Sequence, residues 1–189
     1  MKQLLLLPVI SVMLLGAAYL MADDERYEKA DFRQPAQQRS VSQLPDSPQQ
    51  QSYIKECGSC HMAYQPEFLP KNAWKTMMNG LDDHFGVDAT LAAQDEKILA
   101  SYLQENAADS KRVGKHFKMM AASAGTDGKI IRISDTPYFK REHRGIPQKF
   151  VDQKEVKSIA NCNACHQSAA KGDYRERGIF IPNYGRWDD

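Results

Sequence analysis

Two short stretches decide how this chain folds: CGSCH at residues 57–61 and CNACH at residues 162–166. Each stretch has cysteines at positions i and i+3, followed at once by a histidine, and together they use all four cysteines of the 189 residues. Side chains three positions apart lie on the same side of a helical turn. Two thiols so placed can form thioether bonds to the vinyl groups of one haem, while the next residue presents an imidazole to the iron. Both stretches therefore match the attachment motif of c-type haem.

The motifs predict two covalently bound haem c groups. The residues expected to form thioether bonds are Cys57, Cys60, Cys162 and Cys165. The expected proximal iron ligands are His61 and His166.

Other uses of paired cysteines fit less well. A zinc site would need both pairs together, but 101 residues separate Cys60 from Cys162, and structural zinc does not call for a histidine after each pair. Thioredoxin-like chemistry needs a reactive pair in a βαβ setting, which the sequence does not show. Disulfides within each pair would leave both histidines unexplained.

Three further histidines are available for the sixth ligand positions. His84 and His143 each stand near the expected end of a helix and two residues before a glycine, where the chain can turn away. His84 follows His61 by 23 residues, and His143 precedes His166 by 23. We predict that His84 and His143 are the distal ligands, each serving the nearer haem because short connections are favoured, although one segment could serve the other haem.

The remaining candidates for the sixth ligand are His116 and several methionines. His116 lies between Lys115 and Lys118 and is more naturally a solvated side chain. Methionine is the competing ligand type at either iron; the available residues are Met62, Met77, Met78, Met119 and Met120. Two irons with histidine on both sides would be low spin and closed to substrate, which favours electron transfer over catalysis.

The N-terminal region predicts export. Residues 1–22 have a basic start, an uncharged apolar run and a small residue before Asp23, as a signal peptide does. The uncharged stretch of 19 residues is close to the length that spans a bilayer, so a retained anchor is the alternative. Residues 23–52 are rich in glutamine and proline and predict a flexible linker.

The remainder predicts a mainly α fold. Helices are expected at residues 72–84, 91–107, 136–143 and 154–162, and a short strand at residues 129–133. We divide the chain into a first haem c domain, a basic connector and a second haem c domain, at residues 53–109, 110–135 and 136–189. Domains this small usually need a staple or a cofactor to complete their cores. Tyr64, Trp74 and Tyr174 are expected mainly to pack in those cores.

The charge distribution argues against one partner class. The 25 basic and 24 acidic residues leave a net charge of +1, which does not favour nucleic-acid binding. The near-zero total hides an asymmetry, because residues 57–109 carry a net charge of −5 and residues 110–161 a net charge of +7. A charged partner surface is one explanation of this asymmetry, and neutralisation of haem propionates is another.

From Tyr53 onward the sequence resembles the small periplasmic dihaem cytochromes c. The matching segments are residues 57–64, 68–70, 74, 83–86, 132–139, 143, 158–166 and 172–182. The resemblance implies histidine on both sides of each iron. It also implies a first domain similar to a small monohaem cytochrome c, followed by a second, less regular haem-binding segment.

The resemblance further implies a role in the periplasm. Such proteins transfer single electrons between a membrane-bound donor, expected to be a b-type cytochrome, and a soluble haem protein. A small oxygen-binding cytochrome c is the expected soluble partner. Two rival functions stay open at this point: a haem enzyme, such as a peroxidase or a small-oxyanion reductase with one open iron, and a membrane-anchored electron-transfer subunit.

Overall fold

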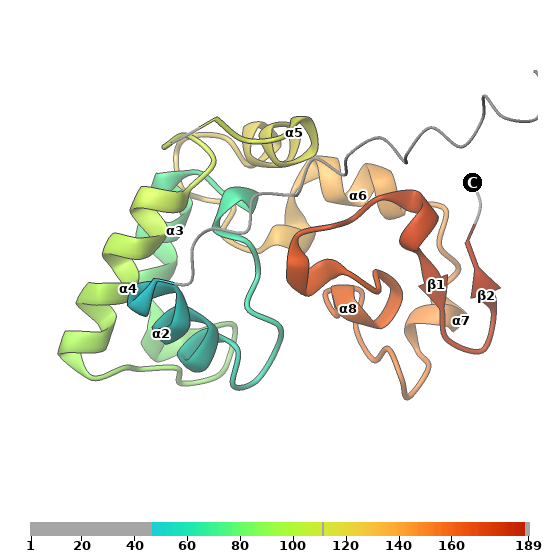
Figure 1. Ribbon diagram of the computed structural model, residues 1–189, viewed down its shortest axis with the longest axis horizontal. Coiled ribbons are helices and arrows are strands. Elements are labelled where there is room, and N and C mark those ends of the chain that lie inside the picture. The colour runs from blue at the N-terminus through green and yellow to red at the C-terminus, as the bar shows by residue number, and fades with distance from the viewer. Residues whose placement is uncertain (1–46, 111, 188–189) are drawn as a thin grey trace, which may run out of the picture. The chain divides into compact units, whose positions relative to one another are not determined.

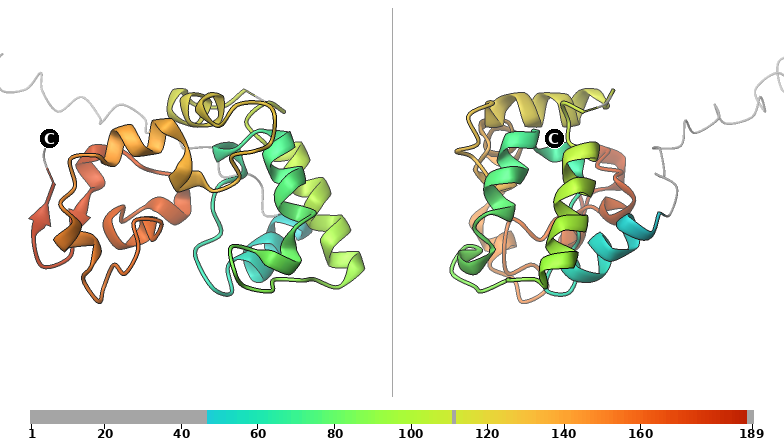
Figure 2. Two further views of the ribbon diagram at one scale, coloured as in Figure 1. Left: turned by 180° about the vertical axis from the view of Figure 1, so that it is seen from behind. Right: turned by 90° about the vertical axis from the view of Figure 1, so that its left-hand side faces the viewer.

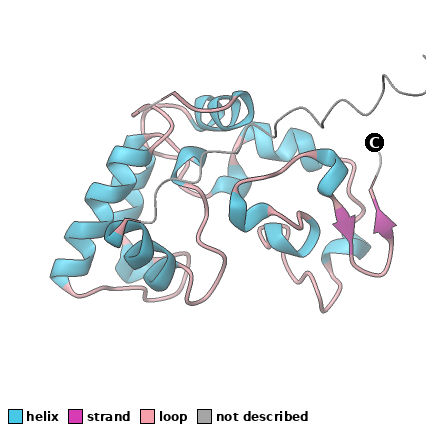
Figure 3. Ribbon diagram, in the orientation of Figure 1, coloured by secondary structure: helices cyan, strands magenta, loops and turns pink. Residues whose placement is uncertain are grey.

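The computed structural model describes residues 47–110 and 112–187. The predicted signal peptide, residues 1–22, and the predicted linker up to residue 46 lie outside the described residues. Figure 3 shows helices joined by loops, with strands only in one short hairpin near the C-terminus. The predicted mainly α fold is therefore confirmed. None of the described helices is long and apolar enough to cross a membrane.

Three helices form the first part of the fold: α2 (Pro48–Cys57), α3 (Lys71–Met78) and α4 (Ala93–Asn106). Both α2 and α3 pack on α4, and the three lie together in Figure 1. Two 3₁₀ turns, η1 (Pro66–Phe68) and η2 (Leu81–Asp83), lie before and after α3.

The predicted linker ends earlier than residue 52, because α2 begins at Pro48. The Ser47 side chain accepts a hydrogen bond from the Gln50 backbone N–H at 3.1 Å, and proline at the first helical position suits this helix start. The helix buries Tyr53, so burial and capping outweigh the polar composition of the segment.

The second part of the fold contains α5 (Lys115–Ala124) followed by a series of short elements. These are η3 (Ile133–Asp135), α6 (Pro137–His143), α7 (Gln148–Val151), α8 (Cys162–Cys165), η4 (Ala169–Lys171), η5 (Glu176–Gly178), and strands β1 (Phe180–Ile181) and β2 (Gly185–Arg186). The two strands pair antiparallel, with Phe180 opposite Arg186. Figure 2 shows α5 from two further sides; it packs against both η1 and α6. The predicted basic connector thus contains a helix that contributes Met120 and Ala124 to the core.

The sequence predicted some elements correctly and others wrongly. The helix at residues 136–143 is confirmed: the buried Thr136 hydroxyl accepts a hydrogen bond from the Phe139 backbone N–H at 3.3 Å. The helix expected at residues 72–84 ends at Met78 and is followed by η2. The helix expected at residues 154–162 is wrong, since Lys157 has a left-handed backbone (φ 65°) that a right-handed helix cannot contain.

The strand expected at residues 129–133 is also wrong. The chain there is irregular and enters η3 at Ile133, and no described strand pairs with it. A strand needs a partner to satisfy its backbone hydrogen bonds, so β propensity without a neighbour does not make one.

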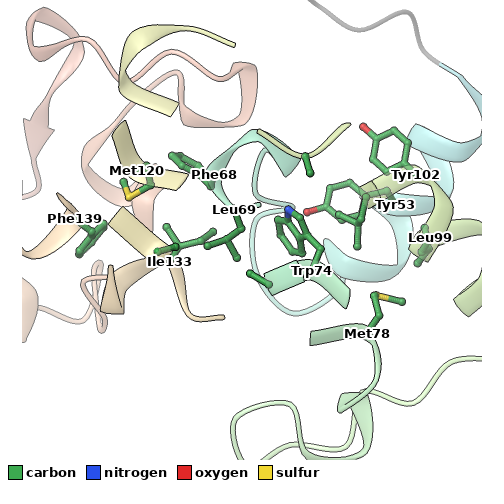
Figure 4. Packing of buried hydrophobic residues seen from close by; sticks show 14 of the residues in the cluster. Tyr53, Phe68, Leu69, Trp74, Met78, Leu99, Tyr102, Met120, Ile133 and Phe139 are labelled. Carbon is green, nitrogen blue, oxygen red and sulfur yellow. The ribbon is translucent and has the colours of Figure 1, made fainter. Parts of the chain in front are cut away.

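Most of the buried hydrophobic residues in the described part of the chain belong to one continuous core. It runs from Tyr53 in α2 through Trp74 and Leu99 to Phe139 in α6, so it includes residues of both predicted haem domains. Figure 4 shows this packing, with Trp74 beside Leu69. Trp74 is 2% exposed, and its indole N–H donates to the Pro66 carbonyl at 2.7 Å.

We expect Trp74→Phe to destabilise the folded protein. The change removes the indole donor and leaves the buried Pro66 carbonyl with only the long 3.4 Å bond from the Leu69 backbone N–H, which costs about 1–3 kcal/mol. Tyr184→Phe is the matched control, because Tyr184 is 56% exposed and its change should stay within about 0.5 kcal/mol. Denaturant unfolding of both variants measures the difference. Equal midpoints would show that the Trp74 hydrogen bond contributes nothing.

Candidate haem sites

The first pair of histidines lies on either side of α3 in the chain. His61 is the last residue of the first motif, and His84 follows η2. Their ring centroids are 6.2 Å apart, with an interplanar angle of 22°. A first-row metal binds an imidazole nitrogen at about 2 Å, so two rings on opposite sides of one ion have centroids about 6 Å apart. The separation leaves room for one iron.

The second pair has the same separation. His143 is the last residue of α6 and His166 caps α8, and their ring centroids are also 6.2 Å apart, at 65°. The structure therefore brings the four predicted iron ligands together as two pairs. In each pair the predicted distal histidine lies beside the predicted proximal histidine that is nearer to it in the sequence.

The two predicted distal ligands are held in different ways. The backbone of His84 donates to and accepts from Val87 (2.8 and 3.3 Å), in a turn where Gly86 has φ +92°. Glycine is needed there, because other residues rarely adopt that conformation. Gly145 has no positive φ, and His143 instead stacks on Phe139 at 3.9 Å between ring centroids.

Hydrogen bonds orient one ring of each pair. The Nδ1 atom of His61 lies 2.8 Å from the Met62 carbonyl oxygen, and that of His143 lies 2.9 Å from the Phe139 carbonyl oxygen. A ring that donates from Nδ1 presents Nε2 as the acceptor, which is the arrangement of a metal ligand. The Nδ1 atom of His166 is buried and bonds to no described residue, so packing orients that ring.

Burial favours the neutral form of His84, His143 and His166. It lowers the pKa of His84, with smaller contributions from His61 and Arg132. It also lowers the pKa of His143. The pKa of His166 falls to about 4, through burial and then the nearby His143. A neutral imidazole is the form that binds a metal, so all three are ready to do so at neutral pH.

None of the four cysteines forms a disulfide in the described part of the chain. Within the described residues, no three His, Cys, Asp or Glu side chains gather as a metal site. The two cysteine pairs thus do not form the shared cluster that a zinc ribbon needs.

The surroundings of both histidine pairs fit a large, mostly apolar group with charged edges. Beside His143 lies a cavity of about 650 Å³, within the usual range of cofactor pockets. Its lining combines apolar Phe139 and Ile159 with the cations Arg132 and Lys140. Next to His84, the turn leaves Phe85 and Val87 exposed, and such apolar surface is normally covered.

Two tyrosines connect the sites, a role that the sequence did not predict. Tyr64 stacks on the His61 ring at 4.9 Å, and its hydroxyl donates to the Ala160 carbonyl at 2.8 Å. The thiol of Cys162 lies 3.4 Å from the same carbonyl. Tyr174 lies 5.3 Å from the His166 ring and donates to the Gln65 side chain. These partners are about 100 residues apart in the chain, so no local pattern reveals them.

His116 lies outside both pairs. It is exposed, and its Nδ1 atom is 2.8 Å from the Tyr138 hydroxyl. Of the methionines considered as ligands, Met78 and Met120 are buried in the core, and the Thr136 hydroxyl contacts the Met120 sulfur at 2.9 Å. Both methionines therefore fill core space.

Comparisons with known proteins agree with this description. The family described as dihaem cytochrome c matches residues 53–174. An X-ray structure of a dihaem cytochrome c from Shewanella baltica OS155 is 34% identical, with a TM-score of 0.61, covering 75% of this chain and 100% of that one. A dihaem cytochrome c from Rhodobacter sphaeroides is also 34% identical, with a TM-score of 0.56, covering 66% and 95%. The comparison with curated proteins found no match.

The chain belongs to the dihaem cytochrome c family. It accordingly carries two covalently bound haem c groups, and membership of this family implies electron transfer. The predicted family, cofactors and fold class are confirmed.

Proposed function

We propose that this protein is a periplasmic carrier of single electrons in which His61 and His84 ligate one haem iron and His143 and His166 ligate the other. The observation that supports this ligation most directly is the equal 6.2 Å separation of the two ring pairs. Haem c, when bound, supplies a one-electron redox centre.

Histidine on both sides of each iron defines what the sites can do. If His61 and His84 hold one haem and His143 and His166 the other, neither site would offer an open position to a substrate. The Met62 and Phe139 carbonyls hold the His61 and His143 rings in the orientation of a ligand. We therefore propose a carrier and not an enzyme. A peroxidase or a small-oxyanion reductase would need one iron open or weakly ligated.

The place of action follows from the export signal. Residues 1–22 are proposed to direct the chain to the periplasm, and an uncleaved signal would instead hold it at the membrane surface. A membrane-bound b-type cytochrome is the proposed donor, and a small soluble haem protein of the oxygen-binding cytochrome c type is the proposed partner.

The charges near the two distal histidines support docking steered by electrostatics. Asp82 and Asp83 are exposed just before His84, and neither forms an ion pair with a described residue. Lys140 and Arg141 are exposed on α6, the helix that carries His143. Carriers use weak complexes of this kind because partners must associate quickly and dissociate quickly.

We expect transfer to a soluble haem partner to slow as salt rises. Stopped-flow mixing of the reduced protein with an oxidised small cytochrome c should give a rate constant that falls on the order of tenfold as the Debye length shortens from about 30 to 8 Å. Charge reversal at Lys140 and Arg141, or separately at Asp82 and Asp83, should alter the rate. Lys154→Glu is the control, because Lys154 is exposed and belongs to neither of these charged pairs.

Two results would count against the proposal in different ways. Rates indifferent to salt and to both reversals would exclude electrostatic steering while leaving electron transfer intact. Turnover of hydrogen peroxide or of a small oxyanion by the isolated protein, together with carbon monoxide binding to the reduced wild type, would support the haem enzyme instead.

A further inference from the structure

Arg132 lies between the two pairs of histidines. Its guanidinium carbon is 4.0 Å from the centroid of the Phe85 ring, and that ring is 4.7 Å from the His84 ring. Arg132 also lines the cavity beside His143, together with Phe139. One cationic side chain is thus shared by the surroundings of both sites.

Arg132 forms an ion pair within the protein that uses only part of its guanidinium group. Arg132 Nε lies 3.6 Å from a carboxylate oxygen of Asp135, and Lys140 lies 3.4 Å from the other oxygen. One carboxylate therefore faces two cations, and the rim of the cavity retains positive charge. A guanidinium has five N–H donors in a planar fork, so a contact through Nε leaves the outer donors available.

The chemistry of the cavity indicates what those donors bind. The cavity has an apolar wall, with Phe139 and Ile159, and a polar rim on which two cations, Arg132 and Lys140, outnumber the single carboxylate of Asp135. An apolar body bearing carboxylates matches this arrangement, and haem c with its two propionates is such a group. Arginine is the residue best suited to bind a carboxylate through two parallel hydrogen bonds.

We propose that Arg132 is a positioning residue shared by the two haems: its guanidinium binds a propionate carboxylate of the second haem, and its charge raises the reduction potentials of both. The proposal rests on the ligation proposed above. A positive charge stabilises the reduced state of an iron, which carries one more electron, so its removal lowers the potential. The Arg132 guanidinium lies over the Phe85 ring, and that ring lies next to the His84 ring, so the charge of Arg132 is close to the first pair as well.

The test is a potentiometric titration of the full protein with both haems attached. Arg132→Gln should lower both midpoint potentials, each by on the order of a tenfold change in the equilibrium constant for reduction, or about 59 mV for one electron. Lys140→Gln should lower one potential only, because Lys140 lines the cavity but does not contact Phe85. Lys129→Gln, at an exposed residue of the same segment that pairs with Asp127 at 3.0 Å, should lower neither.

Two further variants separate this role from a merely structural one. Arg132→Lys keeps the charge and should recover most of the shift. Asp135→Asn removes a negative charge beside Arg132 and should raise the potential of the second haem. If the Arg132–Asp135 ion pair were only structural, Asp135→Asn and Arg132→Gln should instead shift the potential in the same direction. Potentials that stay unchanged in Arg132→Gln, or a change at one haem alone, would overturn the proposal.

The visible spectrum distinguishes a failure of the proposed role of Arg132 from a failure of the proposed histidine ligation. A low-spin spectrum in Arg132→Gln with unchanged potentials would contradict the role of Arg132 and leave the four histidine ligands in place. A wild-type protein with a high-spin haem would contradict the ligation and, with it, the proposed role of Arg132.

Discussion

Replacing His84 with glycine is expected to open one haem iron and leave the other closed. The isolated variant should contain one high-spin haem, and its reduced form should bind one equivalent of carbon monoxide. His143→Gly should have the same effect at the other haem, because each side chain faces one proximal histidine at 6.2 Å between ring centroids. Absorption spectra and carbon monoxide titration measure the change. The double variant should bind two equivalents.

His116→Gly is the matched control for both variants. His116 is exposed and contacts the Tyr138 hydroxyl, outside both ring pairs. Its removal should leave both haems low spin and unable to bind carbon monoxide. If this variant were the one to become high spin, the assignment of the distal ligands would be wrong. A fully low-spin His84→Gly protein would point to a methionine or another group as the sixth ligand of the first haem.

The second large effect is expected at the cysteines. The wild-type protein should carry two haems that resist extraction with acid and organic solvent. Cys162→Ala together with Cys165→Ala should remove both thioether bonds of the second haem, so the intact mass should fall by about one haem. Mass spectrometry of the denatured protein distinguishes covalently attached haem from haem that is bound without a covalent bond.

Ser59→Ala provides a control inside the first motif. Ser59 is exposed between the two cysteines, and its hydroxyl donates to the Glu56 carbonyl at 2.8 Å, so the variant should retain both haems. The double cysteine variant should also lose stability, because the core is shared by both parts of the chain. Two covalent haems in the double cysteine variant would show that the second motif is not an attachment site.

Predictions from the sequence succeeded where local chemistry decided the structure. The helix at residues 136–143 begins with a capping threonine and a proline and ends at His143, and all of these signals lie within eight residues. The sequence-based predictions were wrong where the local structure depended on distant contacts or on the backbone conformation of a single residue. The left-handed Lys157 interrupts the helix expected at residues 154–162, and α5 forms within the predicted connector because η1 and α6 pack against it.

The sequence by itself determined the cofactor chemistry. Two thiols and an imidazole must lie at a fixed spacing to hold one haem. The motifs at residues 57–61 and 162–166 can therefore be recognised without knowledge of the tertiary structure. The candidates for the distal ligands followed from the few remaining histidines and their equal spacing.

Only the tertiary structure decided how the two sites are connected. Tyr64 reaches Ala160 across 96 residues, and Arg132 meets both the Phe85 ring and the cavity at His143. Each of these contacts depends on segments that approach one another only when the shared core forms. Sequence periodicity reports which face of an element is buried, but it carries no information on which distant segment covers that face. For that reason the two sites could be predicted singly, whereas the residue that lies between them could not.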